Sequence, residues 1–199
     1  MFTEMKKRAY TLKRRADSRD ETRARIVAAT VALHEELGPK NTTISAVAER
    51  AGVQRLTVYR HFPDETALFT ACTSQWLEDH PPPDPAAWVE IADDAARVSA
   101  ALTALYSYYR RTQRMWVAAH RDVAEVAALR GPMKKFKTYL AVVADGLAGE
   151  GTGTRHDKIV LTLRHAVQFE TWRSLASQGA ADGALAALVG EWLSALKRG

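Results

Sequence analysis

The chain has 199 residues, with 28 Lys and Arg against 23 Asp and Glu, and Cys72 as its single cysteine. One cysteine excludes an intrachain disulfide, and no Cys/His cluster has the spacing of a structural zinc site. No stretch is apolar and charge-free enough for a secretory leader or a membrane span, so we expect a protein of the reducing cytoplasm with no membrane partner.

The basic excess lies in the N-terminal third of the chain. Residues 1–63 hold thirteen Lys and Arg against seven Asp and Glu, an excess of six, whereas residues 64–199 hold fifteen against sixteen. A local excess is expected of a surface that binds DNA phosphates, because Lys and Arg release the counterions condensed on a duplex. Charge alone leaves a second interpretation open, a solubilising tail.

Two segments are predicted before the first sharp stop. Residues 1–19 are rich in Lys and Arg and show no sustained apolar periodicity, so we expect a flexible basic arm. From Asp20, apolar residues recur at spacings of three and four, which predicts a helix. Gly38 and Pro39 supply its end.

Short helices are expected next. Thr42 and Thr43 are suitable N-caps for a helix that Gly52 ends. A third helix is predicted over residues 54–60 and a fourth over residues 65–79.

The remaining sequence is helical in pattern after a proline-rich connector at residues 81–85. Glycine and proline at residues 131–132 and glycines within 149–153 are expected to break it. The predicted helical segments are 86–110, 112–119, 122–129, 132–148, 155–178 and 182–197. With no alternating strand pattern, we predict an all-α protein of about nine to ten helices.

The stretch from Thr43 to Phe62 has the spacing of a helix-turn-helix. Ala48 is small where the second helix would cross the first, and Gly52 can take the positive φ that ends a helix. Four apolar residues are predicted to face inward: Val47, Ala51, Val53 and Val58.

The outward residues have the chemistry of a reader of DNA. In the major groove Arg55 would pair with guanine and Gln54 with adenine. Contacts to phosphates fix the register of the protein on the duplex. We predict the following DNA-binding residues: Thr42, Thr43, Gln54, Arg55, Thr57, Tyr59, Arg60 and His61. The alternative is a plain helical hairpin with a solvated polar face.

In combination these residues resemble the N-terminal signature of the tetracycline-repressor (TetR) family over about residues 20–70. The resemblance rests on Thr43-Ile44 with Val47-Ala48, Ala51-Gly52-Val53, Thr57-Val58-Tyr59, His61-Phe62 and Leu68. It implies a three-helix DNA-binding domain, a linking fourth helix, a helical ligand-binding domain and dimerisation through the last two helices. Such proteins are usually repressors that a small molecule releases from DNA.

Glu65 departs from the family pattern, which usually has Lys or Arg at this position. A carboxylate suits the positive end of a helix but repels a nearby phosphate. We therefore expect no backbone contact here, and the basic arm or Arg60 to compensate.

Apolar stripes on the last two predicted helices suggest a dimer interface, because a DNA motif of this kind needs two half-sites. Intramolecular core is the alternative. The candidate interface residues are Ile159, Leu163, Val167, Leu185, Leu188, Val189, Trp192 and Leu196.

The middle helices are rich in aromatic residues, which favours an apolar or aromatic effector. Ordinary core packing is the competing interpretation. The candidate ligand-binding residues are Tyr106, Tyr109, Trp116, His120, Phe136, Tyr139, His165, Gln168, Phe169 and Trp172.

We predict a ligand-responsive, dimeric DNA-binding regulator with an arm at 1–19, a DNA-binding domain at 20–63 and a helical domain at 64–199. Its partners would be palindromic operator DNA, a small-molecule effector and a second copy of itself, in a bacterial cytoplasm. The histidines do not cluster, and no nucleophile elbow or nucleotide-binding loop occurs, so we expect neither catalysis, a cofactor nor a metal. Two alternatives stay open: an effector-independent DNA-binding dimer, and a helical protein-interaction module.

Overall fold

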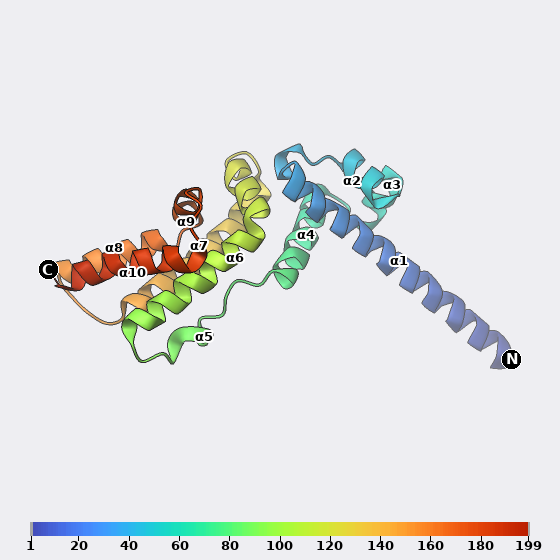
Figure 1. Ribbon diagram of the computed structural model, residues 1–199. Coiled ribbons are helices and arrows are strands. Elements are labelled where there is room, and N and C mark those ends of the chain that lie inside the picture. The colour runs from blue at the N-terminus through green and yellow to red at the C-terminus, as the bar shows by residue number, and fades with distance from the viewer. Residues whose placement is uncertain (1, 199) are drawn as a thin grey trace. The chain divides into compact units, whose positions relative to one another are not determined.

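The computed structural model describes the backbone of residues 2–198 and the side chains of residues 17–196. Over that backbone the chain forms ten α-helices, one 3-10 helix and no strand (Figure 1). The all-α prediction is therefore confirmed. No helix in this part of the chain combines the length and apolar character that crossing a bilayer requires.

The chain divides into two compact units. The first runs up to Asp79 and also includes Ala118–Leu129, and the second consists of His80–Val117 and the residues from Arg130 onward. The first unit thus extends beyond the range 20–63 that we expected from sequence. Leu68 explains part of the difference, because this residue of the fourth helix is buried in the same apolar core as the helix-turn-helix.

The first unit contains α1 (Phe2–Glu36), the 3-10 helix η1 (Pro39–Asn41), α2 (Ile44–Ala51), α3 (Arg55–His61) and α4 (Glu65–Asp79). Helix α1 begins at Phe2, so the backbone of residues 2–19 is helical where we expected a flexible basic arm over residues 1–19. Among the described side chains of α1, from Asp17 onward, Ile26 is the first that is buried. Lys, Arg and Ala have high helix propensity, so the backbone is helical through residues 17–25 although none of their side chains is buried.

A second segment of the first unit closes over the turn after α1. The side chain of Asp122 accepts a hydrogen bond from the Lys40 backbone N–H at 3.1 Å and from Arg121 at 2.7 Å. Arg121 also donates to the Leu37 carbonyl at 2.8 Å. A Cβ added to Gly38, whose φ is +87°, would overlap the Arg121 and Asp122 side chains. Gly38 is therefore needed for its conformation and for this close approach.

The second unit contains α5 (Ala86–Val89), most of α6 (Asp94–Asp122) and of α7 (Ala127–Ala148), and all of α8 (Thr154–Ala166), α9 (Phe169–Ala176) and α10 (Asp182–Arg198). Helix α6 runs without interruption through the two breaks that we predicted near residues 111 and 120. Helix α7 continues through Pro132. Pro132 is the sixth residue of α7, so its missing N–H and the bulk of its ring perturb only the beginning of the helix, and the rest is retained.

The predicted segment 155–178 is instead two helices, α8 and α9, although no glycine or proline separates them. At the junction, the Tyr106 hydroxyl donates to the Ala166 carbonyl at 3.0 Å. The Tyr109 hydroxyl donates to the Val167 carbonyl at 2.6 Å. Carbonyls at a helix end lack intrahelical partners, so these contacts from α6 stabilise a break that no local signal in the sequence predicts.

Candidate nucleic-acid interface

Helices α2 and α3 are joined by a tight turn with local determinants. The Thr43 side chain accepts a hydrogen bond from the Ala46 backbone N–H at 3.2 Å and so caps α2. Gly52 adopts the left-handed conformation, with φ 64° and ψ 40°. The Val53 N–H then donates to the Ala48 carbonyl at 2.9 Å, which ends α2. The predicted caps at Thr43 and Gly52 are present.

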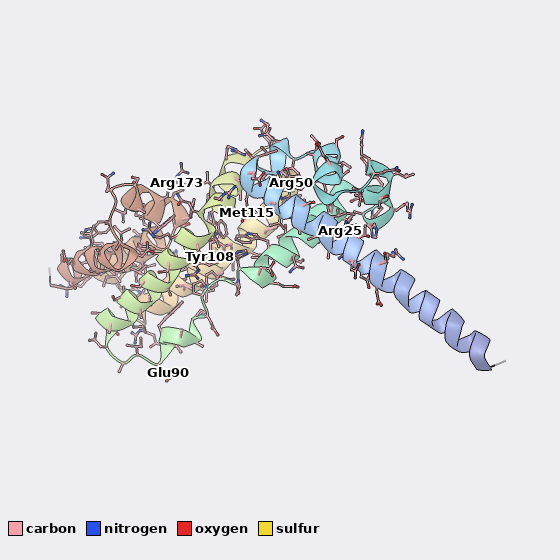
Figure 2. All side chains as sticks on the ribbon, turned by 45° about the vertical axis from the view of Figure 1, so that its right-hand side comes forward. Arg25, Arg50, Glu90, Tyr108, Met115 and Arg173 are labelled. Carbon is pink, nitrogen blue, oxygen red and sulfur yellow. The ribbon has the colours of Figure 1, made fainter. Side chains whose placement is uncertain are left out.

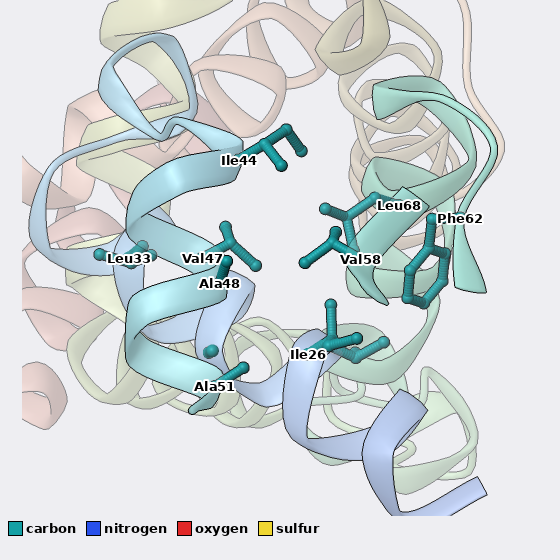
Figure 3. Packing of buried hydrophobic residues seen from close by; sticks show 11 residues of the cluster. Ile26, Leu33, Ile44, Val47, Ala48, Ala51, Val58, Phe62 and Leu68 are labelled. Atoms are coloured by element: carbon teal, nitrogen blue, oxygen red, sulfur yellow. The ribbon is translucent and has the colours of Figure 1, made fainter. Parts of the chain in front are cut away.

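The inner faces of these helices form a small aliphatic core (Figure 3). Val47 and Val58 are almost wholly buried, and Ala48 and Ala51 are buried beside them. Figure 3 shows Ile26 and Leu68, from α1 and α4, pointing into the same core. Val53 is only partly buried, so it contributes less to the core than we expected. Close packing of small side chains fixes the crossing of the two helices.

The outer face of α3 carries most of the predicted DNA-binding residues. Gln54, Arg55, Tyr59 and Arg60 are exposed, whereas Thr57 and His61 are half-buried. Helix α3 therefore presents two cations, an aromatic ring and an amide on one short segment, a combination suited to base edges and phosphates.

The two threonines before α2 are engaged differently. The Thr43 hydroxyl is occupied as the α2 cap, and the Thr42 hydroxyl donates to the Gly38 carbonyl at 2.9 Å. Thr42 is thus bound to the preceding turn and does not cap α2 as proposed from sequence.

Leu56 is a candidate contact that the sequence interpretation missed. Its side chain is 66% exposed, the largest exposure among the large apolar residues of α3. Residues three and four apart share a helix face, so Leu56 lies near Tyr59 and Arg60. Apolar side chains contact the methyl group of thymine in the major groove. The sequence did contain a signal for this contact, because Leu56 is an apolar residue between Arg55 and Thr57, two positions that were predicted to face outward.

Positive charge converges at the end of α3. The pKa of His61 is lowered by partial burial and by the charges of Arg19, Arg60 and Arg23, against the opposing effect of Asp20. The Arg23 guanidinium carbon lies 4.9 Å from the centre of the Phe62 ring. Cations of α1 and α3 therefore act on the same imidazole.

Two neighbouring charged groups have structural roles. Arg50, marked in Figure 2, donates two hydrogen bonds to the Glu36 carboxylate, at 2.8 and 2.7 Å, and so links α2 to α1. The Asp64 carboxylate accepts from the Ala67 N–H at 2.7 Å at the start of α4, where Glu65 is exposed. Both acidic groups suit the positive end of that helix.

The aromatic ligand candidates form a packed cluster in the second unit. Tyr106, Tyr109, Trp116, Phe169 and Trp172 are buried. Ring centroids of Trp116 and Phe136 lie 4.2 Å apart, and those of Tyr109 and Phe169 lie 5.4 Å apart.

The polar atoms of several cluster members bind within the chain. In addition to the two tyrosine contacts at the α8–α9 junction, Trp172 donates to Asp182 at 3.1 Å and Tyr139 to the Pro83 carbonyl at 2.6 Å. These contacts give the residues a role in the core of the second unit.

The polar ligand candidates do not join this cluster as a group. His120 belongs to the first unit. His165 is exposed, and Gln168 donates to the Arg164 carbonyl at 2.8 Å. The sequence could not separate these residues from the cluster, because each lies in or next to a segment that was predicted to be helical and is near aromatic residues.

Half of the residues predicted to form the dimer interface are buried in the core of the second unit. Buried within their own unit, and so without surface for a partner, are Leu163, Val167, Leu185 and Val189. Partly exposed are Ile159, Leu188, Trp192 and Leu196, with Trp192 at 39%. Leu161, which we did not predict, is 66% exposed on α8. The apolar stripe of each helix therefore spans both the core and its edge.

Comparison with known proteins finds one family model that matches part of the first unit. Residues 26–72 match the family model described as bacterial regulatory proteins, tetR family. This range covers the end of α1, the helix-turn-helix and the first half of α4. No curated protein matches the chain by sequence.

Solved structures share the fold of most of the chain. A TetR-like transcriptional regulator from Rhodococcus sp. RHA1 is 17% identical, with a TM-score of 0.63, and the match covers 85% of this chain and 91% of that one. A second transcriptional regulator from the same organism is 20% identical, with a TM-score of 0.56, covering 87% and 96%. The multidrug binding protein EbrR, complexed with imidazole, is 19% identical, with a TM-score of 0.53, covering 87% and 88%.

Proposed function

We propose that this chain is a ligand-responsive repressor, because residues 26–72 match the family model of bacterial regulatory proteins, tetR family, and the chain has the fold of a TetR-like transcriptional regulator. It binds a palindromic operator as a homodimer and leaves the DNA when a small effector binds. The observation that carries the proposal is the exposed face of α3, set on the buried core of a helix-turn-helix.

Helix α3 reads the major groove in this proposal. Arg55 pairs with guanine and Gln54 with adenine, and Leu56 contacts a thymine methyl. Tyr59 and Arg60 bind phosphates and fix the register. The excess of positive charge in residues 1–63 supports binding that weakens steeply as salt concentration rises.

Two copies associate through α8 and α10 in this proposal. Leu161 and Trp192 are exposed, and Ile159 and Leu188 are partly so, which leaves apolar area for a partner. Because a palindromic operator has two half-sites, a symmetric dimer presents one recognition helix to each.

The effector is an apolar or aromatic molecule in this proposal. The aromatic cluster of the second unit supports this class, and EbrR, a structural neighbour, is described as a multidrug binding protein. The internal hydrogen bonds of Tyr106, Tyr109 and Trp172 favour the second candidate function, an effector-independent DNA-binding dimer with a filled core. Tryptophan fluorescence and thermal unfolding with a panel of aromatic compounds separate the two, since only a ligand-responsive protein shifts.

Footprinting and salt titration test the proposal on the intergenic DNA beside the gene. The wild-type protein should protect two half-sites, and Arg55→Ala and Tyr59→Ala should each lose affinity by about 1–3 kcal/mol. Arg114→Ala, which removes an exposed arginine of the second unit, is the matched control and should bind normally.

Equal binding by all four proteins would refute a role for α3 in reading DNA. Absence of salt-dependent duplex binding by the wild-type protein would refute DNA binding and favour the protein-interaction module.

A further inference from the structure

We propose that Arg19, Arg23, Arg60 and His61 form one phosphate-binding site that takes up a proton when it binds the DNA backbone. The inference rests on the proposed DNA-binding function. It adds two residues of α1 to the interface and makes operator affinity depend on pH. It also supplies a phosphate contact where Glu65, with its negative charge, provides none.

The position of the four side chains supports a single site. Arg23 lies over the ring of Phe62, which directly follows His61 in the chain. Phe62 is buried in the core of the first unit, so it provides a fixed platform for the guanidinium. Arg19 is four residues before Arg23 and therefore shares its face of α1.

The charges around His61 come from two helices. Arg19 and Arg23 of α1 and Arg60 of α3 act on the imidazole as cations, and Asp20 of α1 acts as an anion. Asp64, just before α4, lines a groove together with Asp20 and Arg23. Partial burial is the largest cause that lowers the pKa of His61 below its usual 6.5, and each of the three cations has a larger effect than Asp20.

A bound phosphodiester reverses this balance. Its negative charge offsets the guanidinium groups, and its oxygens accept a hydrogen bond from the protonated imidazole. The pKa of His61 therefore rises in the complex. Binding then takes up a proton, so affinity increases as pH falls through the interval between the free and bound pKa values.

The test measures affinity for one operator duplex at pH 6 and pH 8 at constant ionic strength. Wild-type protein should bind up to about three- to tenfold more tightly at pH 6, since a rise of about half to one unit in the pKa of one group changes affinity by at most that factor. His61→Gln keeps a donor but cannot titrate, so its pH dependence should be reduced to about twofold or less. Circular dichroism at both pH values verifies that each protein is folded.

Proton NMR of the His61 ring gives a second readout that does not depend on affinity. The pKa of the wild-type imidazole should rise by about half a unit or more on addition of duplex. Arg23→Ala should raise the pKa of His61 in the free protein and lower the salt dependence of binding. Arg25→Ala removes an exposed arginine of the same helix, marked in Figure 2 and not among the charges that act on His61, and should leave the pH dependence unchanged.

The outcomes separate this inference from the proposed function. Wild-type protein that binds no duplex at either pH overturns both. Protein that binds DNA but shows the same pH dependence in His61→Gln, or no rise in the His61 pKa with duplex, overturns only the proton-linked site.

Discussion

The two units each contain a short, tight junction between helices, but the junctions are stabilised in different ways. Between α2 and α3 the turn depends on Gly52, which adopts a positive φ of 64° that is unfavourable for residues with a Cβ. Between α8 and α9 the backbone carbonyls of Ala166 and Val167 accept hydrogen bonds from two tyrosines that lie 60 and 58 residues earlier in the sequence. One junction is local in origin, and the other depends on tertiary contacts.

The buried polar side chains of the two units also differ, in the strength of their hydrogen-bond partners. In the second unit Tyr106 and Tyr109 have backbone carbonyl acceptors. In the first unit the buried ring of His34 has the Cys72 sulfur 3.4 Å from Nδ1, a weak partner, and packs against Phe69 with ring centroids 5.5 Å apart. A charged imidazole is therefore poorly accommodated in the first unit, whereas the tyrosines of the second are neutral in any ordinary buffer.

The largest expected effect is acid destabilisation through His34. Burial lowers its pKa from 6.5 to about 4, against the opposing charge of Asp122. Below pH 6.5 the unfolded chain binds a proton that the folded chain does not, so the free energy of unfolding falls as pH decreases to about 4. The loss should reach about 3 kcal/mol and is measured by urea denaturation between pH 7 and pH 4.5.

Two variants isolate this effect. His34→Leu should flatten the pH dependence of stability, whereas His165→Gln, which replaces an exposed histidine of the second unit, should retain it. If the free energy of unfolding of His34→Leu depends on pH as steeply as that of the wild type, another group causes the acid sensitivity. The contrast drawn between the buried polar groups of the two units would then be wrong.

An intermediate effect is expected for Tyr109→Phe. The change removes a buried hydrogen bond and leaves the Val167 carbonyl without its donor, which should cost about 1–3 kcal/mol of unfolding free energy. Tyr59→Phe removes an exposed hydroxyl from α3 and should change stability by less than about 0.5 kcal/mol. Equal stability of the two variants would mean that the α8–α9 junction does not depend on its tyrosine.

The smallest effect is expected for Gly52→Ala. No atom lies within 4 Å of the added methyl group, so only the left-handed backbone opposes it, at a cost of about 1 kcal/mol. Gly131→Ala, inside helix α7 and equally free of contacts, should instead stabilise by about 0.5–1 kcal/mol. Thermal unfolding that gives both changes the same sign would contradict a local origin of the α2–α3 turn.

The helix-turn-helix was predictable because its determinants lie within about 20 residues. Thr43, Ala48 and Gly52 each act on neighbours in the chain, and their roles follow from cap chemistry and side-chain size. The break after Val167 was not predictable, since its stabilising hydroxyls are in α6.

Periodicity also has limits in both units. It identified apolar faces on α8 and α10 but could not tell which side chains of a face are buried in the core of the chain itself: Leu163 is buried, whereas Ile159 is only partly buried. It missed the start of α1 as well, because the helix is continuous through residues 17–25, none of whose side chains is buried.

The side chains that meet at Gly38 have a consequence for recombination between related genes. Asp122 and Arg121 complete the first unit from a position some 80 residues later in the chain, at separations of 82 and 84 from their partners. A chimera joined at the proline-rich segment would therefore inherit a foreign residue at each of these positions. Only donors that carry an acidic residue equivalent to Asp122 should yield a stable hybrid. The helix-turn-helix of this protein therefore cannot be exchanged as an N-terminal segment alone.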